Sequence, residues 1–136
     1  MNERRMSPVL KWAGGKTQLL EAIAARMPAH YDRYFEPFIG GGAVLLAVSP
    51  EKAAVNDINE QLINLYSQLK SNAPMLIDIV SELDRSPCDA EMYYSIRERY
   101  NAKISANILD VECAALMIWL NKHCFNGLYR VNNKGL

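Results

Sequence analysis

Apolar residues recur at helical spacing in several stretches of the chain. The first stretch, from Leu19 to Met27, predicts a helix that Pro28 ends. Residues 89–104 predict an amphipathic helix with one exposed face, and the almost wholly apolar residues 110–120 predict a helix buried on most sides. From Asn121 onward, polar, basic and aromatic residues with glycines predict loops. Two further helices are predicted from the one-sided sets Leu62, Leu65, Tyr66, Leu69 and Leu76, Ile77, Val80, Leu83, the second with Pro74 at its start.

A different pattern follows the first predicted helix. The apolar segment 35–39 stops at three consecutive glycines, residues 40–42, and a short helix to Val48 follows. A second apolar strand, residues 53–55, then leads to Asp57. This order predicts two parallel strands joined by a helical crossover, and therefore an α/β fold.

The glycine turn, defined here as residues 37–42, is the predicted ligand site. In open α/β sheets, ligands bind at the carboxyl ends of strands, where glycine lets the backbone approach them closely. An acidic residue that ends the next strand can hold ribose hydroxyls, and Asp57 stands in that position. In the alternative interpretation, Asp57 is a carboxylate near a helix N-terminus that interacts with the helix macrodipole.

Two common phosphate-binding motifs do not fit the glycines. Gly15-Lys16-Thr17 resembles the end of a P-loop, but that pattern needs Gly where this chain has Leu10. Counted from Gly40, the last glycine of the dinucleotide pattern falls on Leu45. Nucleotide hydrolysis at Lys16 is therefore a disfavoured alternative, and a nucleoside-binding unit preceded by a glycine-lysine turn remains.

Composition predicts one soluble domain. The chain has 136 residues, 50% of them hydrophobic and 22% charged. Its most apolar run, residues 113–120, is shorter than the roughly 20 residues that a membrane span needs. Three cysteines without C-x-x-C spacing and no signal-like segment predict a cytoplasmic protein. A zinc site at His123 and Cys124 is rejected because no second ligand pair exists, so no metal is predicted.

The formal net charge is zero at pH 7, but the charges are unevenly distributed. Residues 1–16 hold four basic residues and one acidic residue, whereas residues 121–136 hold three basic residues and no acidic one. If the two ends meet in space, they form a positive patch suited to phosphate contact. The alternative is that the basic residues at the two ends reflect only chance variation in two short segments.

Four sequence blocks follow one another along the chain: Lys11-Trp12-Ala13-Gly14-Gly15-Lys16, Phe35-Glu36-Pro37-Phe38-Ile39-Gly40-Gly41-Gly42, Asn56-Asp57-Ile58-Asn59, and Leu120-Asn121 to Asn126-Gly127-Leu128-Tyr129-Arg130. Together they resemble, in order and spacing, the Dam family of adenine-specific DNA methyltransferases, and the resemblance covers essentially the whole chain. It implies the N-terminal part of a Rossmann-like methyltransferase sheet, with residues 1–72 binding S-adenosylmethionine and residues 73–136 forming the helical start of a target-recognition domain.

The resemblance implies S-adenosylmethionine as methyl donor and the exocyclic amine of adenine in double-stranded DNA, at GATC, as acceptor. Asp57 would accept hydrogen bonds from both ribose hydroxyls. The cofactor-binding residues that the resemblance implies are Trp12, Lys16, Pro37, Phe38, Gly40, Gly42, Asp57 and Ile58.

The resemblance also implies four DNA-binding residues. Lys11 and Arg130 would read guanine edges, which accept hydrogen bonds at O6 and N7. Phe125 would insert into the base stack beside Asn126 when the adenine is extruded. The family more often has Tyr at this position, and without the resemblance Phe125 and Tyr129 would be interpreted as core aromatics.

The family's catalytic motif, Asp-Pro-Pro-Tyr or a close variant, has no counterpart in this chain, whose six prolines all stand apart. In the family that motif positions the amine and stacks on the flipped base, and positioning supplies much of the rate. No catalytic residue is therefore predicted, and the chain alone is expected to be inactive or nearly so. The two strands are also expected to lack partners at their outer edges.

The missing half of the enzyme would come either in the same polypeptide or as a second chain. The alternative is a non-catalytic remnant that binds DNA or a partner chain through residues 122–134.

Overall fold

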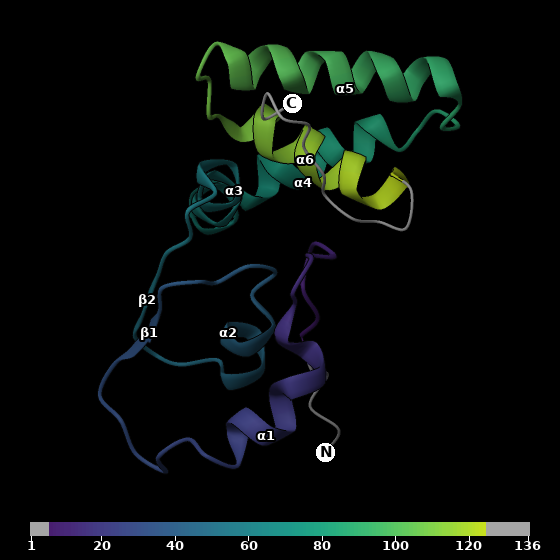
Figure 1. Ribbon diagram of the computed structural model, residues 1–136. Helices are drawn as coiled ribbons and strands as arrows, with labels where there is room; N and C mark the ends of the chain where they lie inside the picture. The colour runs from purple at the N-terminus through teal and green to yellow at the C-terminus, as the bar shows by residue number, and fades with distance from the viewer. Residues whose placement is uncertain (1–5, 125–136) are drawn as a thin grey trace. The chain divides into compact units, whose positions relative to one another are not determined.

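The computed structural model describes residues 6–124, and the chain divides into two compact units between Ile58 and Asn59 (Figure 1). The functional boundary expected at residues 72 and 73 stays a prediction. In the described part of the chain, no helix has both the length and the apolar character that a membrane span requires.

The first unit is built on two short parallel strands, β1 (Tyr34–Glu36) and β2 (Ala53–Val55). Their register pairs Tyr34 with Ala53 and Glu36 with Val55. Helix α2 (Ala43–Val48) connects the strands, so the predicted crossover between parallel strands is confirmed (Figure 1). Among residues 6–124 the sheet has these two strands alone, and each therefore has one unpaired edge.

The first predicted helix is shorter than its apolar pattern suggested. It consists of the 3₁₀ turn η1 (Lys16–Leu19) and α1 (Leu20–Ala24), and therefore ends before Met27. No side chain caps the start of α1 and none of its residues is buried. Short helices depend on buried contacts for their stability. Because α1 has no buried residue, such contacts do not extend the helix to Pro28.

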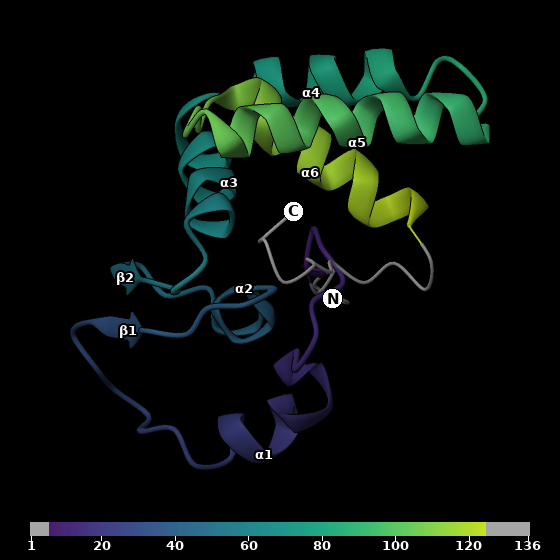
Figure 2. The ribbon, with the colours of Figure 1, turned by 45° about the horizontal axis from the view of Figure 1, so that its top comes forward.

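The second unit consists of α3 (Glu60–Ser71), α4 (Ala73–Leu83), α5 (Ala90–Ser105) and α6 (Val111–His123) (Figure 2). Helix α6 contacts the other three helices. Its residues 113–117 and Trp119 are buried, which confirms the prediction of a helix covered on most sides. Helix α5 buries only Ile96 and Tyr100, as expected for an amphipathic helix.

Side-chain caps set where three of these helices begin. Asn59, Asp89 and Asp110 each accept a hydrogen bond at 2.8 Å from the backbone N–H three residues later. The end of α6 corrects the sequence prediction, because the helix continues through His123 instead of giving way to a loop at Asn121. Asn121 is buried and the His123 ring stacks on Trp119 with centroids 4.1 Å apart, and these contacts favour the extra turn.

Candidate functional site

Segments distant in the sequence of the first unit meet at the carboxyl ends of β1 and β2. The glycine turn follows β1, and Ile39 N–H donates to the Asn56 carbonyl at 2.9 Å, which joins the turn to the end of β2. Ile39 is 1% exposed and packs in the small core of the unit. The turn and the residues after β2 are therefore fixed next to each other.

Asp57 is bonded directly to the glycine turn. Its Oδ2 accepts a hydrogen bond of 3.0 Å from the Gly40 N–H. Gly40 has φ +52, a left-handed conformation that glycine adopts without steric cost. Asn59, and not Asp57, provides the side-chain cap of the following helix α3.

The segment before η1 packs on the same turn. A Cβ atom added to Gly40 would lie 3.2 Å from Trp12 Cδ1. One added to Gly41 would lie 3.3 Å from both Trp12 Cβ and the Leu10 carbonyl oxygen. Leu10 itself is buried. The absence of a Cβ atom at Gly40 and Gly41 thus leaves room for Trp12.

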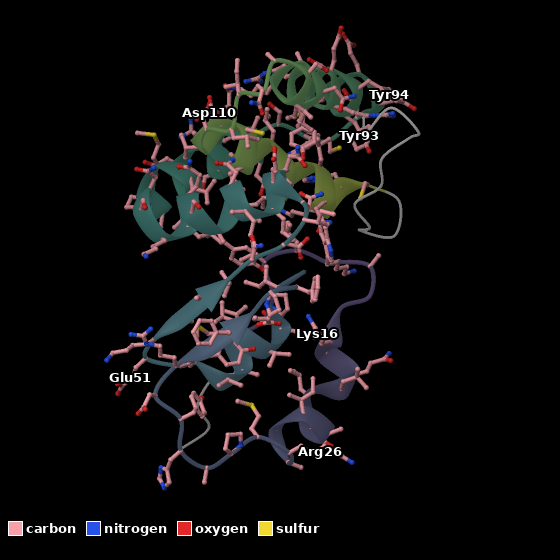
Figure 3. The ribbon with its side chains drawn as sticks, turned by 60° about the vertical axis from the view of Figure 1, so that its left-hand side comes forward. Lys16, Arg26, Glu51, Tyr93, Tyr94 and Asp110 are labelled. Carbon is pink, nitrogen blue, oxygen red and sulfur yellow. The ribbon has the colours of Figure 1, made fainter. Side chains whose placement is uncertain are left out.

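Lys16 connects the lysine-bearing turn to the end of β1. Its Nζ lies 3.3 Å from Glu36 Oε1 and donates to the Phe38 carbonyl oxygen at 2.5 Å. Figure 3 shows the Lys16 side chain directed toward the strands. Of the predicted cofactor residues, Lys16, Phe38, Gly40 and Asp57 are therefore brought into one place, with Trp12 packed against them.

Glu36 is a site residue that the sequence analysis did not assign. It is 6% exposed, and in the described part of the chain its two oxygens take bonds from Lys16 and from the Tyr34 hydroxyl, the latter at 2.8 Å. A carboxylate within an apolar strand needs such partners, because burial of an unpaired charge is costly. The available signal was a carboxylate between Phe35 and Pro37 in an otherwise apolar segment, with a lysine-bearing turn earlier in the sequence.

Three predicted residues at the site present side chains to solvent. Phe38 is 72% exposed, Ile58 is 94% exposed, and Pro37 is also exposed. Exposed apolar surface beside a fixed carboxylate is typical of a place where a ligand binds. Gly42 has φ +73 and is the N-terminal cap residue of α2.

The predicted DNA-binding residues are only partly described. Lys11 is exposed. Phe125, Asn126 and Arg130 lie outside the described residues, so their roles stay predictions.

A separate depression of about 800 Å³ lies at the other end of the strands. It is lined by residues 29–33 and 49–52, which precede β1 and β2. None of the predicted site residues lines it. The assembled site at the carboxyl ends is thus a different place from this depression.

The fold and the site define a parallel α/β unit with a fixed carboxylate, a partly buried ion pair and a glycine turn at one sheet edge. Comparison with protein families matches residues 12–136 to the D12 class N6 adenine-specific DNA methyltransferases. The chain belongs to that family, which confirms the predicted resemblance.

Curated relatives extend this match. The chain is 41% identical over 133 residues to the type II methyltransferase M1.LlaDCHI of Lactococcus lactis subsp. cremoris, covering 98% of the chain and 46% of the relative. It is 39% identical to the type II methyltransferase M.MjaIII of Methanocaldococcus jannaschii, with 96% and 50% covered. It is 36% identical to the DNA adenine methylase of Escherichia coli K12, with 93% and 44% covered. The chain thus spans about half the length of these relatives.

Proposed function

We propose that this chain supplies the cofactor-binding part of an enzyme that transfers a methyl group from S-adenosylmethionine to the exocyclic amine of adenine in double-stranded DNA. One observation carries the proposal: in a member of this family, Lys16, the glycine turn and Asp57 meet at the carboxyl end of the sheet. The sheet would be the first part of a Rossmann-like methyltransferase fold.

The chemistry of the assembled groups fits S-adenosylmethionine. The Asp57 carboxylate suits the ribose hydroxyls as donors, and the exposed side chains of Phe38 and Ile58 suit the adenine ring. Lys16 donates to two acceptors in the described part of the chain, and an ammonium has three N–H donors. The third donor suits the carboxylate of the methionine moiety.

The bound cofactor would supply an activated methyl group on its sulfonium sulfur. The residues of this chain would bind and orient it. The groups that hold the acceptor amine are proposed to lie in an Asp-Pro-Pro-Tyr segment, in the same polypeptide or a second chain, because residues 1–136 contain no adjacent prolines. Residues 1–136 by themselves are expected to transfer no methyl group.

Calorimetric titration with S-adenosylmethionine tests the cofactor site in the complete protein that carries residues 1–136. Asp57→Ala and Lys16→Ala are each expected to weaken binding about tenfold or more, because each removes a hydrogen bond that involves a charged group. Asp32→Ala and Lys52→Ala, at the opposite end of the strands, are the matched controls. Binding that tolerates both site variants would refute the assigned site.

Methyl transfer to duplex DNA tests the acceptor. A duplex with one GATC is expected to accept methyl groups, and one with the same four bases ordered CTAG is not. Transfer to both duplexes would refute the proposed target sequence. Salt-sensitive DNA binding without any transfer by the complete protein would favour the non-catalytic alternative.

A further inference from the structure

We propose that Tyr34 is a positioning residue for the cofactor: its hydroxyl orients Glu36, and Glu36 holds the Lys16 ammonium at the glycine turn. This inference rests on the proposed function, because it assigns Lys16 to the methionine moiety of S-adenosylmethionine. It adds a residue outside the four sequence blocks that carry the family resemblance.

A continuous chain of hydrogen bonds supports this role. The Tyr34 hydroxyl donates to Glu36 Oε2 at 2.8 Å, and Lys16 Nζ lies 3.3 Å from Glu36 Oε1. Tyr34 and Glu36 are two residues apart on β1, so their side chains project from the same face of the strand. Each carboxylate oxygen thus has a different partner, and the plane of the carboxylate is fixed.

The burial of Glu36 makes the hydroxyl important. The Glu36 side chain is 7% exposed, whereas the Lys16 side chain is 34% exposed. Water therefore reaches the ammonium more readily than the carboxylate. Without the Tyr34 hydroxyl, Oε2 would be buried with no donor among the described residues, and the carboxylate would rotate toward solvent or share Lys16 between its oxygens.

Tyr34 remains a hydrogen-bond donor throughout the pH range in which proteins are normally folded. Burial of the phenol, followed by its hydrogen bond to the Glu36 carboxylate, raises the pKa of Tyr34 well above that of free tyrosine. The hydroxyl therefore keeps its proton beside the negative charge.

The position of Lys16 affects only part of the ligand. The ammonium faces the Phe38 carbonyl in the glycine turn, where the methionine moiety is proposed to lie. Asp57, which is proposed to bind the ribose, is held by a separate hydrogen bond from the Gly40 N–H. Loss of the Tyr34 hydroxyl should therefore lower the affinity for ligands that carry the methionine moiety. It should leave the affinity for ligands that carry only the adenosine part unchanged.

Calorimetry on the complete protein with two ligands tests this selectivity. The probes are S-adenosylmethionine and 5′-methylthioadenosine, which has the adenosine and the sulfur but no amino-acid group. Tyr34→Phe, which keeps the ring, is expected to lower the affinity for S-adenosylmethionine about tenfold, because it removes one hydrogen bond to a charged group. It is expected to change the affinity for 5′-methylthioadenosine by less than about twofold.

Two further variants separate positioning from packing. Tyr31→Phe is the matched control, because Tyr31 is an exposed tyrosine three residues earlier, and it should change neither affinity. The double variant Tyr34→Phe/Glu36→Gln should bind S-adenosylmethionine no more weakly than Glu36→Gln alone, because the hydroxyl acts through the carboxylate.

The outcomes distinguish this inference from the proposed function. Equal weakening of both ligands by Tyr34→Phe, or no weakening of either, would overturn the positioning role while leaving the cofactor site in place. Additive losses in the double variant would overturn it as well. A wild-type protein that binds neither ligand would overturn the proposed function and this inference together.

Discussion

At the scale of single residues, the glycine turn depends on two different properties of glycine. Gly40 combines a left-handed φ of +52 with a close neighbour, because an added Cβ would lie 3.2 Å from Trp12. Gly14 has a similar φ of +74, but an added Cβ there would meet nothing within 4 Å. Substitutions at Gly14 would therefore introduce backbone strain alone, whereas substitutions at Gly40 would introduce both backbone strain and a close contact with Trp12.

We expect Gly14→Ala to lower the free energy of unfolding by about 1 kcal/mol, the cost of a left-handed non-glycine residue. Gly40→Ala should cost more, about 2 kcal/mol or above, because Trp12 must also move. Urea unfolding monitored by Trp fluorescence measures both. Equal losses would show that Trp12 does not crowd Gly40.

Sequence patterns predicted part of the proposed site for identifiable physical reasons. Gly40 and Asp57 could be predicted because a turn after one strand and an acid after the next must meet at the same sheet edge. Lys16 and Trp12 were implied only by the family resemblance. Glu36 was missed because its partners, Tyr34 and Lys16, become neighbours only when the strand and η1 are placed in three dimensions.

At the scale of elements, α2 ends in an unfavourable residue. Ser49 is its C-terminal cap and has φ 47 and ψ 55, a conformation that glycine usually supplies. Its hydroxyl donates to the Leu46 carbonyl at an exposed position, so that bond contributes little. The helix is therefore held at its end with backbone strain.

We expect Ser49→Gly to raise the free energy of unfolding by about 0.5 kcal/mol, the relief of strain less the added freedom of the unfolded chain. Ala47→Gly, within the same helix, is the matched control and should lower stability by about 0.5–1 kcal/mol. Urea unfolding curves check both changes. A loss of stability in Ser49→Gly would contradict the interpretation of strain.

Ion pairs tie α5 to the start of α6. Lys103 lies 2.7 Å from both Asp110 and Glu112, and Arg99 also bonds Glu112. The hydrogen bonds from Lys103, then from Arg99, lower the pKa of Glu112. Burial alone would raise the pKa of Asp110, but its bonds from Lys103 and the Cys113 N–H outweigh burial and lower it.

These lowered pKa values predict a loss of stability in acid. Carboxyls with a folded pKa below the unfolded value stabilise fully above about pH 5 and lose that contribution as pH falls through the folded pKa. Both carboxylates are about a third or more exposed, so the effect is at most about 1 kcal/mol. Unfolding at pH 7 and pH 3 should show a smaller acid loss in Lys103→Met than in wild type. An identical pH dependence would exclude this contribution.

The sequence predicted the helices correctly where the residues that start a helix stand next to its apolar positions. Asp89 and Asp110 stand before apolar runs and cap α5 and α6. The prediction was less accurate for α1, whose apolar spacing continues to Met27 although no buried surface supports the helix beyond Ala24. The sequence prediction also ended α6 too early. The polar residues after Leu120 indicated a loop, and the stacking of His123 on Trp119 cannot be inferred from the polarity of the sequence.

At the scale of the whole molecule, the described residues form a parallel sheet of two strands. The two strands have unpaired outer edges within residues 6–124, and the chain spans about half the length of its curated relatives. Phe35 on β1 is also 66% exposed. The site is therefore proposed to become complete, and catalytic, only with further parts of the enzyme.

The central claim is that S-adenosylmethionine binds at the carboxyl ends of β1 and β2. Hydrogen exchange of the complete protein, measured by mass spectrometry with and without the cofactor, locates the site directly. We predict slower exchange on cofactor addition in residues 37–42 and 56–58, with no change in residues 29–33. Protection confined to residues 29–33 and 49–52, which line the depression at the opposite end of the strands, would contradict the claim.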